Sequence, residues 1–435
     1  MVFRTHPGPP PAGENQMTSI EIHAARVRDL LAPLATHGGR ENLPLHPAII
    51  TAHPGAYDRR MLAHDVHSPL DLPRFDNSQM DGFAVRAADL ASATPEHPVT
   101  LKVAASIPAG ELAPRHHSGT ATGIMTGSPL PVGADAVVPI ERADPPRFIA
   151  EGTVSFSRPV VPTAFVRSRA SDSRVGELVL PTGTVLHAAH YGLLASLGIT
   201  EITVVPRLRV LIVPTGNEIR PAGTVLEDAH IYDANGALLA EAVREAGAVP
   251  IVVPCMSDQA EDLLALLADH AADADLVITA GGVSAGAYEV VRDALSPVGS
   301  EFGHVALQPG GPQGLGLVRV TENTHLPIVS LPGNPVSVGM SFEVFLRPLL
   351  RSLAGRVPAE RSLLRAPLAT GLESPEHVHQ IRRGILDDEG LVHLVGGTSS
   401  HLLTSYARAT VLLHIPAGTA HVAAGDTVEI WRIDD

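Results

Sequence analysis

The stretch RLRVLIVPT, Arg207 to Thr215, decides the fold. It is a short apolar run rich in Val, Leu and Ile, which is typical of a strand buried on both faces. Segments of alternating character follow it: the helix-like NGALLAEAVREAG, SDQAEDLLALLADHAA, YEVVRDALS and PVSVGMSFEVFLRPLLRSLAG, and the strand-like VPIVVP, DLVITAG and PIVSLPG. This alternation predicts βαβ units around a mostly parallel sheet.

The rest of the chain consists mainly of short strand-like runs. HPVTLKVAAS, DAVVPIE and ITVVP lie between Gly and Pro residues before residue 205, with one helix predicted over residues 188–198. Residues 356–435 return to short strands and predict a small β-barrel. Thr18 and Glu21 form a predicted capping box ahead of an amphipathic helix. The expected fold class is therefore multidomain α/β plus β, with a central α/β domain, β-rich domains and a C-terminal barrel.

Composition excludes several classes of function. The chain has 435 residues and a formal net charge of −15. That length predicts about three domains, and the acidic balance argues against nucleic acid or an anionic membrane as partner. Cys255 is the only cysteine, which excludes an internal disulfide and a CxxC zinc site. No apolar run matches a signal peptide or a spanning helix, so we expect a cytoplasmic protein whose residues 1–17 are disordered.

Distinctive loops follow the predicted parallel strands. The first strand ends in PTGNE (Pro214 to Glu218), the third in TAGGVSAG (Thr279 to Gly286) and the last in SLPGNP (Ser330 to Pro335). Ligands of open α/β sheets bind beyond the carboxyl ends of the strands, where glycine permits close backbone approach and helix N-termini favour anions. A single such loop is more simply a tight turn, but three at one sheet edge predict an anion-binding site.

Acidic residues at the same edge predict a cation site. Glu218, Asp233 and Glu289 offer the oxygen ligands that a hard cation takes when it bridges phosphates. The alternative for Asp233, and for the nearby Asn235, is a helix N-cap, and both explanations stay open from the sequence.

The stretch LQPGGPQGLG, Leu307 to Gly316, is a further glycine-rich candidate. Its four glycines and two prolines predict a loop whose amides approach a ligand closely, yet it contains no lysine or arginine. Lys102 is the only lysine among 31 cationic residues, so arginine is the expected substitute elsewhere in the chain. The stretch is either an anion site without its own cation or a turn between two strands.

Other catalytic motifs are weaker. GVSAG, Gly282 to Gly286, matches a nucleophile elbow with Ser284 as nucleophile, and HGG at His37 to Gly39 resembles an oxyanion motif. A hydrolase of that type needs further βα units after the elbow to carry its Asp and His, and only one strand and one helix follow. There is no Walker A sequence and no G-x-G-x-x-G after the first strand, which disfavours P-loop NTPases and dinucleotide dehydrogenases. The 22 histidines have no metal-binding spacing, and Cys255 is expected to be an inert core residue.

Two stretches before the α/β region resemble signatures of the molybdopterin molybdenumtransferase family, the MoeA and gephyrin E-domain type. They are SPLDLPRFDNSQMDGFAV (Ser68 to Val85) and GIMTGSPLPVGADAVVPIE (Gly123 to Glu141). YGLLASLGI, PTGNEI, IYDAN, TAGGVSAGAYEVV, QPGGP and SLPGNPVS follow in the family's order, so the resemblance covers nearly the whole chain from Ser19.

The resemblance implies an activity and an assembly. Family members insert molybdate into the dithiolene of adenylylated molybdopterin, cleave the pyrophosphate and release AMP with a divalent cation, usually Mg²⁺. They are elongated homodimers whose active site combines the α/β domain of one subunit with the MDG domain of the other. Further expected partners are the molybdopterin adenylyltransferase and molybdoenzyme apoproteins, without nucleic acid or membrane.

The resemblance also implies domain limits. Residues 18–50 and 160–205 are expected to form a discontinuous linker and dimerisation domain, and residues 51–159 a β-rich domain that carries the MDG and MTG motifs. Residues 206–355 form the expected MogA-like, molybdopterin-binding α/β domain, and residues 356–435 the C-terminal barrel.

The site residues are carried over position by position. The expected catalytic residues are Asp81 and Thr126 on the partner-subunit side, Asp172, and the cation ligands Glu218, Asp233 and Glu289. Residues expected to bind substrate are Thr215, Gly216, Gly281, Gly282, Ser284, Pro309, Gly310, Pro332, Gly333, Asn334, Pro335, Arg383 and Ser400.

This sequence departs from the family pattern at several positions. Members usually have Tyr where Phe83 stands, Asp where Asn217 and Glu289 stand, and an acidic or polar residue near Ala287. Before Asp172, Ala170 and Ser171 replace the usual Gly-Glu.

The largest departure is in the glycine-rich stretch. The family often has K/Q-P-G-K-P with a further basic residue after G-F-G, and those places hold Gln308, Gly311 and Leu317 here. Losing a charge-assisted contact to a buried phosphate weakens binding roughly 10- to 100-fold unless another cation compensates. Arg292, Arg319 and Arg383 are the candidates for compensation. Two hypotheses follow: an active molybdenum insertase, which we favour, and a weakened paralogue that serves as a dimeric binding scaffold.

Overall fold

A computed structural model describes residues 17–36, 39–107, 110–111, 114–284 and 289–434. The chain divides into two compact units, which are described separately. One comprises Met1–Glu41, Arg59–Met61 and Val205–Asp435, and the other comprises Asn42–Asp58 and Leu62–Val204. We call them the α/β unit and the N-terminal unit. Apart from Met17, the tail predicted to be disordered lies outside the described residues.

A six-stranded sheet forms the centre of the α/β unit. Its strand order is β16-β13-β17-β21-β20-β18. The predicted parallel part is confirmed, because β13, β16, β17 and β21 pair in parallel, whereas β20 and β18 are antiparallel additions at one edge. The strands are β13 (Arg209–Pro214), β16 (Val249–Val252), β17 (Leu276–Ala280), β18 (Ser300–His304), β20 (Pro312–Arg319) and β21 (His325–Leu331).

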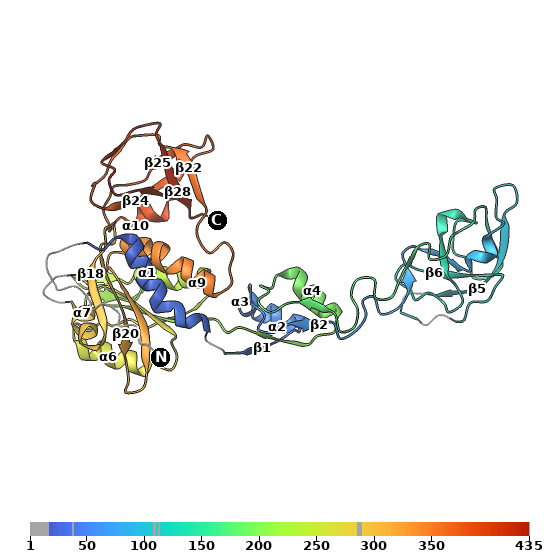
Figure 1. Cartoon of the computed structure of the whole chain (residues 1–435), viewed down its shortest axis with the longest axis horizontal. Helices are drawn as coiled ribbons and strands as arrows, with labels where there is room; N and C mark the ends of the chain where they lie inside the picture. The colour runs from blue at the N-terminus through green and yellow to red at the C-terminus, as the bar shows by residue number, and fades with distance from the viewer. Residues whose placement is uncertain (1–16, 37–38, 108–109, 112–113, 285–288, 435) are drawn as a thin grey trace, which may run out of the picture. The chain divides into compact units, whose positions relative to one another are not determined.

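Helices cover both faces of this sheet (Figure 1). Val210 and Ile212 of β13 pack in a core with α1 (Ile20–Leu31), α5 (Asn235–Ala246), α8 (Pro335–Ser341) and α9 (Arg347–Leu353). Leu211 and Val213 point to the other face, where α6 (Ala260–Asp269) and α7 (Val290–Leu295) pack. This alternation explains why the opening stretch has no polar face: both sides of the strand are covered.

Helix α1 begins one residue later than its predicted capping box. Ser19 is the N-cap, and its hydroxyl accepts a hydrogen bond from the Ile22 amide at 3.3 Å. Thr18, which was expected to cap, is extended instead: its amide donates to the carbonyl of His304 at 2.8 Å, and its own carbonyl accepts from Ala306. The prediction for Thr18 was wrong because the amide and carbonyl of Thr18 pair with His304 and Ala306, so that Ser19 caps the helix instead.

The C-terminal residues form the predicted barrel-like sheet, in the order β19-β24-β26-β28-β22 with β25 beside β24. The first strand of this sheet, Leu307–Gln308, pairs in parallel with β24 although it comes from the middle of the chain. Three residues later the chain enters β20 of the central sheet, so the segment Pro309–Gly311 joins two sheets. The elements are β19 (Leu307–Gln308), β22 (Leu363–Pro367), β23 (Leu372–Glu373), β24 (His379–Leu386), β25 (Val392–Leu394), α10 (Leu403–Ala407), β26 (Val411–Ile415), β27 (His421–Val422) and β28 (Thr427–Arg432).

The N-terminal unit is β-rich, as predicted. A mixed six-stranded sheet in the order β7-β4-β6-β5-β9-β8 encloses the buried rings of Phe83 and Phe156. A second core around Leu62 and Leu194 includes the predicted helix over 188–198, observed as α4. The unit contains α2 (Pro47–Ala52), α3 (Pro54–Tyr57), β2 (Val66–His67), β3 (Asn77–Ser78), β4 (Gly82–Val85), β5 (Val99–Ile107), β6 (Thr120–Ile124), β7 (Ala136–Pro139), β8 (Ala143–Asp144), β9 (Thr153–Phe156), β10 (Val166–Arg167), β11 (Leu178–Leu180), α4 (Ala188–Ser196) and β12 (Glu201–Val204), which pairs with β1 (Glu41–Pro44).

Across the described ranges, no helix combines the length and the apolar character that crossing a membrane requires.

Candidate functional site

One large cleft of about 930 Å³ opens at the carboxyl ends of the parallel strands. The loops after β13, β17 and β21 meet there, together with the segment Pro309–Gly311 and residues 398–400 of the C-terminal sheet. The structure therefore brings together most of the substrate and cation residues expected from the sequence. Those that line the cleft are Thr215, Gly216, Glu218, Asp233, Gly281, Gly282, Ser284, Glu289, Pro309, Gly310, Pro332, Gly333, Asn334, Pro335 and Ser400.

The three predicted cation ligands lie along one wall of this cleft, which we call the acidic wall. The Asp233 carboxylate accepts a hydrogen bond from the Gly236 amide at 2.8 Å, and Glu289 accepts from the Ser284 amide at 2.9 Å. The Glu218 carboxylate lies so close to Gly216 that an added Cβ there would be 2.4 Å from its Oε2. Gly216 has φ +144°, so its backbone conformation requires glycine, whereas the Glu218 carboxylate is the end of a flexible side chain.

The acidic wall fits only one kind of magnesium site. Within the described residues, no three His, Cys, Asp or Glu side chains are grouped closely enough to hold a metal ion by themselves. Mg²⁺ bound with substrate phosphates usually takes only one or two carboxylates and keeps several waters. Separate carboxylates along a cleft match that mode of binding and do not match a closed, all-protein metal cage.

The opposite wall is the segment Gln308–Gly311, which we call the glycine wall. Gln313, which is 1% exposed, donates from Nε2 to the Gly310 carbonyl and to the Ser341 hydroxyl, each at 2.7 Å. The Gln308 side chain accepts from Gln380 of β24 at 2.6 Å. The glycine wall is thus held from below by the central sheet and from the side by the C-terminal sheet.

The composition predicted that the glycine-rich stretch, Leu307 to Gly316, forms one loop, and this prediction was wrong. Residues 312–316 belong to β20, and only Pro309–Gly311 connects two strands. A Cβ on Gly314 would meet the Phe302 ring at 2.4 Å, and one on Gly316 would meet the Gly299 carbonyl oxygen at 2.2 Å. These two glycines serve close packing between β18 and β20 rather than ligand binding.

Arg383 and Ser400 were expected near the anionic ligand, and the structure separates their positions. Ser400 lines the cleft and its hydroxyl accepts from Asn334 at 2.8 Å. Arg383 is 1% exposed and lies beneath that segment, where its Nη2 donates to the carbonyls of Gly397 and Ser399. Burial and the neighbouring Arg382 lower the pKa of the Arg383 guanidinium, and its Nε and Nη1 have no partner among the described residues. Arg383 therefore supports the segment that carries Ser400.

The other two arginines proposed to replace the missing lysine do not line the cleft either. Arg292 donates from Nη1 to the Ser284 carbonyl at 2.9 Å and lies over the Phe302 ring. Arg319 is at the far end of β20 from the glycine wall, roughly 23 Å away at the usual rise of a strand.

Two of the expected catalytic residues in the N-terminal unit are in contact with each other. The Asp81 carboxylate accepts from the Thr126 amide at 2.7 Å and from the Thr126 hydroxyl at 2.8 Å. The backbone bond and then the side-chain bond hold the pKa of Asp81 below its usual value. Asp172 is on an exposed turn, where its amide donates to the Leu72 carbonyl.

The hydrolase alternative gains no support from the described geometry. The Ser284 amide and carbonyl are held by Glu289 and Arg292. Residues 285–288 of the elbow motif, and His37 and Gly38 of the HGG motif, lie outside the described residues.

Cys255 is buried at the end of a strand, as expected. Burial raises the pKa of its thiol. A raised pKa leaves little thiolate at neutral pH, so the residue is a core side chain rather than a nucleophile.

Three acidic or basic residues of the cleft were missed by the sequence reasoning: Asp258, His304 and His377. Asp258 follows the strand-like VPIVVP and lies at the same sheet edge as the other loops, so its position after a strand was a usable signal. His304 is the last residue of β18, and His377 lies in the turn before β24; the pattern assigned neither to the site, and no local motif marks them.

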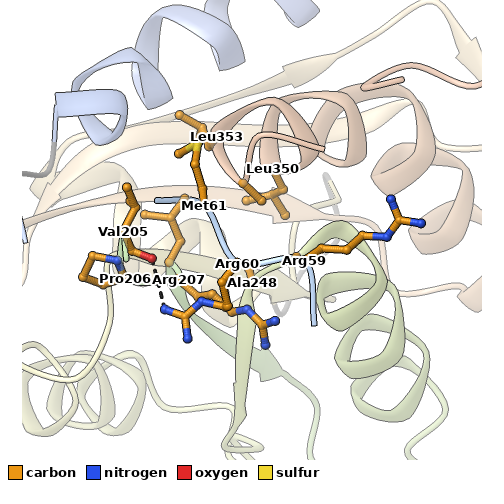
Figure 2. Close-up of a pocket in the computed structure, with 12 residues that line it drawn as sticks. Arg59, Arg60, Met61, Val205, Pro206, Arg207, Ala248, Leu350 and Leu353 are labelled. Atoms are coloured by element: carbon orange, nitrogen blue, oxygen red, sulfur yellow. Dashed lines mark hydrogen bonds between the residues drawn. The ribbon is translucent and has the colours of Figure 1, made fainter. Parts of the chain in front are cut away.

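The α/β unit has a second, far smaller cavity of about 30 Å³. It lies between residues 59–61, residues 205–208 and the ends of α5 and α9 (Figure 2). It has room for about one water molecule. Arg60, which is 3% exposed, donates to the Val205 carbonyl at 3.1 Å and is paired with Glu41. These contacts give Arg60 a structural role where the chain leaves and re-enters the unit.

Comparisons with known proteins agree along the whole chain. Residues 19–198 match the family model of the MoeA N-terminal region (domain I and II), and residues 365–433 match that of the MoeA C-terminal region (domain IV). Residues 211–352, which carry the acidic wall and the loop after β21, match the "probable molybdopterin binding domain".

Individual relatives match at similar extent. Molybdopterin molybdenumtransferase 2 of Mycobacterium tuberculosis is 45% identical over 386 residues, which is 86% of this chain and 92% of the relative. Molybdopterin molybdenumtransferase of Synechococcus elongatus is 34% identical over 85% of this chain and 91% of its own. The crystal structure of a molybdopterin biosynthesis MoeA protein from Pyrococcus horikoshii superposes with a TM-score of 0.76 at 29% identity and covers 96% of this chain and 99% of its own. The chain thus belongs to the molybdopterin molybdenumtransferase family, a family of transferases of molybdenum cofactor biosynthesis.

Proposed function

We propose that this protein inserts molybdate into adenylylated molybdopterin and releases AMP with the help of Mg²⁺. The observation that carries the proposal is the convergence of three strand-end loops and the glycine wall on one cleft of about 930 Å³. That volume lies within the range of small-molecule sites, roughly 300 to 1,000 Å³. The transferase names of the relatives favour this function over the scaffold hypothesis.

The acidic wall would hold the cation. One or two of the carboxylates of Glu218, Asp233 and Glu289 would bind a cation that also contacts the substrate phosphates. A cation held there would supply positive charge beside those phosphates.

The glycine wall offers a backbone donor to the same phosphates. In a trans peptide, the carbonyl and the following amide N–H point in opposite directions. The Gly310 carbonyl points inward to Gln313, so the Gly311 N–H points away from the interior, on the cleft side. Asn334 and Ser400, bonded to each other, orient polar groups at the far end of the cleft.

We place Asp81 and Thr126 in the active site of the partner subunit of a homodimer. Their exposed surface is flanked by Met80 and Met125, which are 36% and 42% exposed. Apolar side chains of this size beside a fixed carboxylate are typical of a surface that another surface covers. Asp172, on its exposed turn, is assigned to the same side.

AMP release tests the proposal directly. The purified protein is mixed with adenylylated molybdopterin, molybdate and Mg²⁺, and AMP is measured by chromatography. We expect AMP only when both molybdate and Mg²⁺ are present, and its loss when EDTA removes the cation. Substrate binding without AMP release, with the dimer intact by light scattering, would instead identify a scaffold.

A further inference from the structure

The lining of the cleft is unusually poor in cations for a site that takes an anionic substrate. Four carboxylates line it, those of Glu218, Asp233, Asp258 and Glu289. In the part of the chain that the structure describes, no lysine or arginine is among the lining residues, and the only basic side chains there are His304 and His377. A cation would offset charge at the acidic wall, but beside the Gly311 amide the glycine wall has no lysine or arginine among the described lining residues.

His304 is fixed at the glycine wall by its backbone. It is the last residue of β18 and is paired with Pro312 in the antiparallel β18–β20 ladder. Its carbonyl accepts from the Thr18 amide at 2.8 Å, and the next amide, of Val305, donates to the Gly311 carbonyl at 2.7 Å. The imidazole itself is exposed and has no hydrogen bond or ion pair with the described residues.

The His304 ring occupies the space of a side chain at position 311. A Cβ built on Gly311 would be 2.3 Å from Nε2, 2.5 Å from Cε1 and 3.0 Å from Cδ2 of His304, and these are its three nearest atoms. The φ of Gly311 is not in the left-handed region, so its backbone does not itself require glycine. The nearest atoms to a side chain at position 311 therefore belong to the His304 ring, the end of an exposed side chain, which would have to move aside.

We propose that His304 is the substrate-binding residue of the glycine wall: its imidazole donates a hydrogen bond to an anionic oxygen of the substrate pyrophosphate, beside the Gly311 amide. The assignment rests on the proposed function. In this chain the imidazole comes from the neighbouring strand, and Gly311 leaves the ring its present space.

The experiment separates His304 from its surroundings with four variants. His304→Ala removes the donor, and His304→Gly combined with Gly311→Lys exchanges the imidazole for a lysine. Gly311→Lys alone keeps the steric conflict, and His325→Ala is a control because His325 is an exposed histidine at the start of β21, outside the cleft lining. Steady-state AMP release gives KM and kcat, and calorimetry gives the Kd of inorganic pyrophosphate with Mg²⁺. Thermal unfolding checks that each variant is folded.

We expect His304→Ala to raise KM and the pyrophosphate Kd about 10- to 100-fold, the effect of one charge-assisted hydrogen bond, with a smaller change in kcat. The double variant should recover both constants, whereas Gly311→Lys alone should not improve them. A pyrophosphate Kd in His304→Ala equal to that of wild type and His325→Ala would overturn the assignment. If wild type releases no AMP but His304→Ala still loses pyrophosphate binding, the proposed function fails and His304 keeps its role.

Discussion

The two walls of the cleft are built on different principles. The acidic wall consists of side chains on loops that follow parallel strands, and Asp233 and Glu289 are each held by a nearby backbone amide. The glycine wall consists of backbone and is positioned by residues distant in sequence, Gln313 from β20 and Gln380 from β24. The acidic wall can therefore be recognised in local motifs, whereas the glycine wall forms only after two sheets have come together.

The largest effect is expected when the charge of the acidic wall is neutralised. Glu218→Gln and Asp233→Asn should each lower AMP release by more than about 100-fold, because they remove charge that positions the cation at the reacting phosphates. Asn at 233 still accepts the Gly236 amide, so the start of α5 stays intact. Glu241→Gln, on the exposed side of α5 and paired with Arg244, is the matched control. AMP release within a few-fold of wild type would show that these carboxylates do not hold the cation.

Two buried histidines of the α/β unit, His23 and His414, make the stability of the protein depend on pH. Burial lowers the pKa of His23 to about 4 and that of His414 to about 3, with smaller contributions from Arg26 and His379 respectively. Between about pH 4 and pH 6.5, the two imidazoles bind protons in the unfolded chain but stay neutral in the folded protein. Their stabilising contribution is therefore complete above pH 6.5 and is lost as the pH falls towards 4, by roughly 2 to 3 kcal/mol for each residue.

Urea unfolding at pH 7.5, 6, 5 and 4 measures this loss. The His23→Gln variant should show a shallower pH dependence than wild type, and His325→Gln, at an exposed position, should not. An unchanged slope in His23→Gln would contradict a neutral, buried imidazole at this position.

A smaller and more selective effect is expected from Gln313→Ala. The change leaves the Gly310 carbonyl and the Ser341 hydroxyl without their donor, which should cost about 1 to 3 kcal/mol of stability. KM should rise because the glycine wall loses its support, while the dependence of the rate on Mg²⁺ should stay as in wild type. Gln259→Ala, at an exposed position before α6, is the control. An altered Mg²⁺ dependence with an unchanged KM would mean that the two walls are not independent.

The smallest effect is expected from Leu317→Lys. The family resemblance led us to expect a second basic side chain at this position, but Leu317 is 54% exposed on β20 and is not part of the cleft lining. Restoring a cation there should leave KM for adenylylated molybdopterin unchanged within about twofold, since exposed charges at a distance are screened. A clear fall in KM would show that β20 contributes to the glycine wall beyond Pro312.

The central fold could be predicted from the sequence because burial on two faces leaves a plain signal. Every residue of β17 is buried, and such a run of apolar residues has few alternatives. Strand β20 was missed because Gly314 and Gly316 are required by contacts with Phe302 and Gly299, which no local pattern reveals. The capping of α1 was misplaced by one residue for a similar reason, since Thr18 pairs with residues about 290 positions later.

The candidate site was predictable to the same degree. Glu218 follows β13 and Asp233 lies in the connection from β13 to α5, so their placement at one sheet edge followed from the topology. His304 is the last residue of a strand that pairs antiparallel at the edge of the sheet, and its relation to Gly311 depends on that pairing. His304 belongs to no sequence motif, and only its position beside Gly311 in the structure marks it as a candidate site residue.

The pairing of β19 with β24 has a consequence for the biosynthesis of the protein. Chains emerge from the ribosome N-terminus first, at about 5 to 20 residues per second. Glu218 and Asp233 are synthesised long before His379–Leu386 and Ser400, which complete the cleft and anchor Gln308. A nascent or truncated chain that lacks these residues therefore carries Glu218 and Asp233 without a finished cleft, and we expect it to bind no substrate until the last sheet has folded.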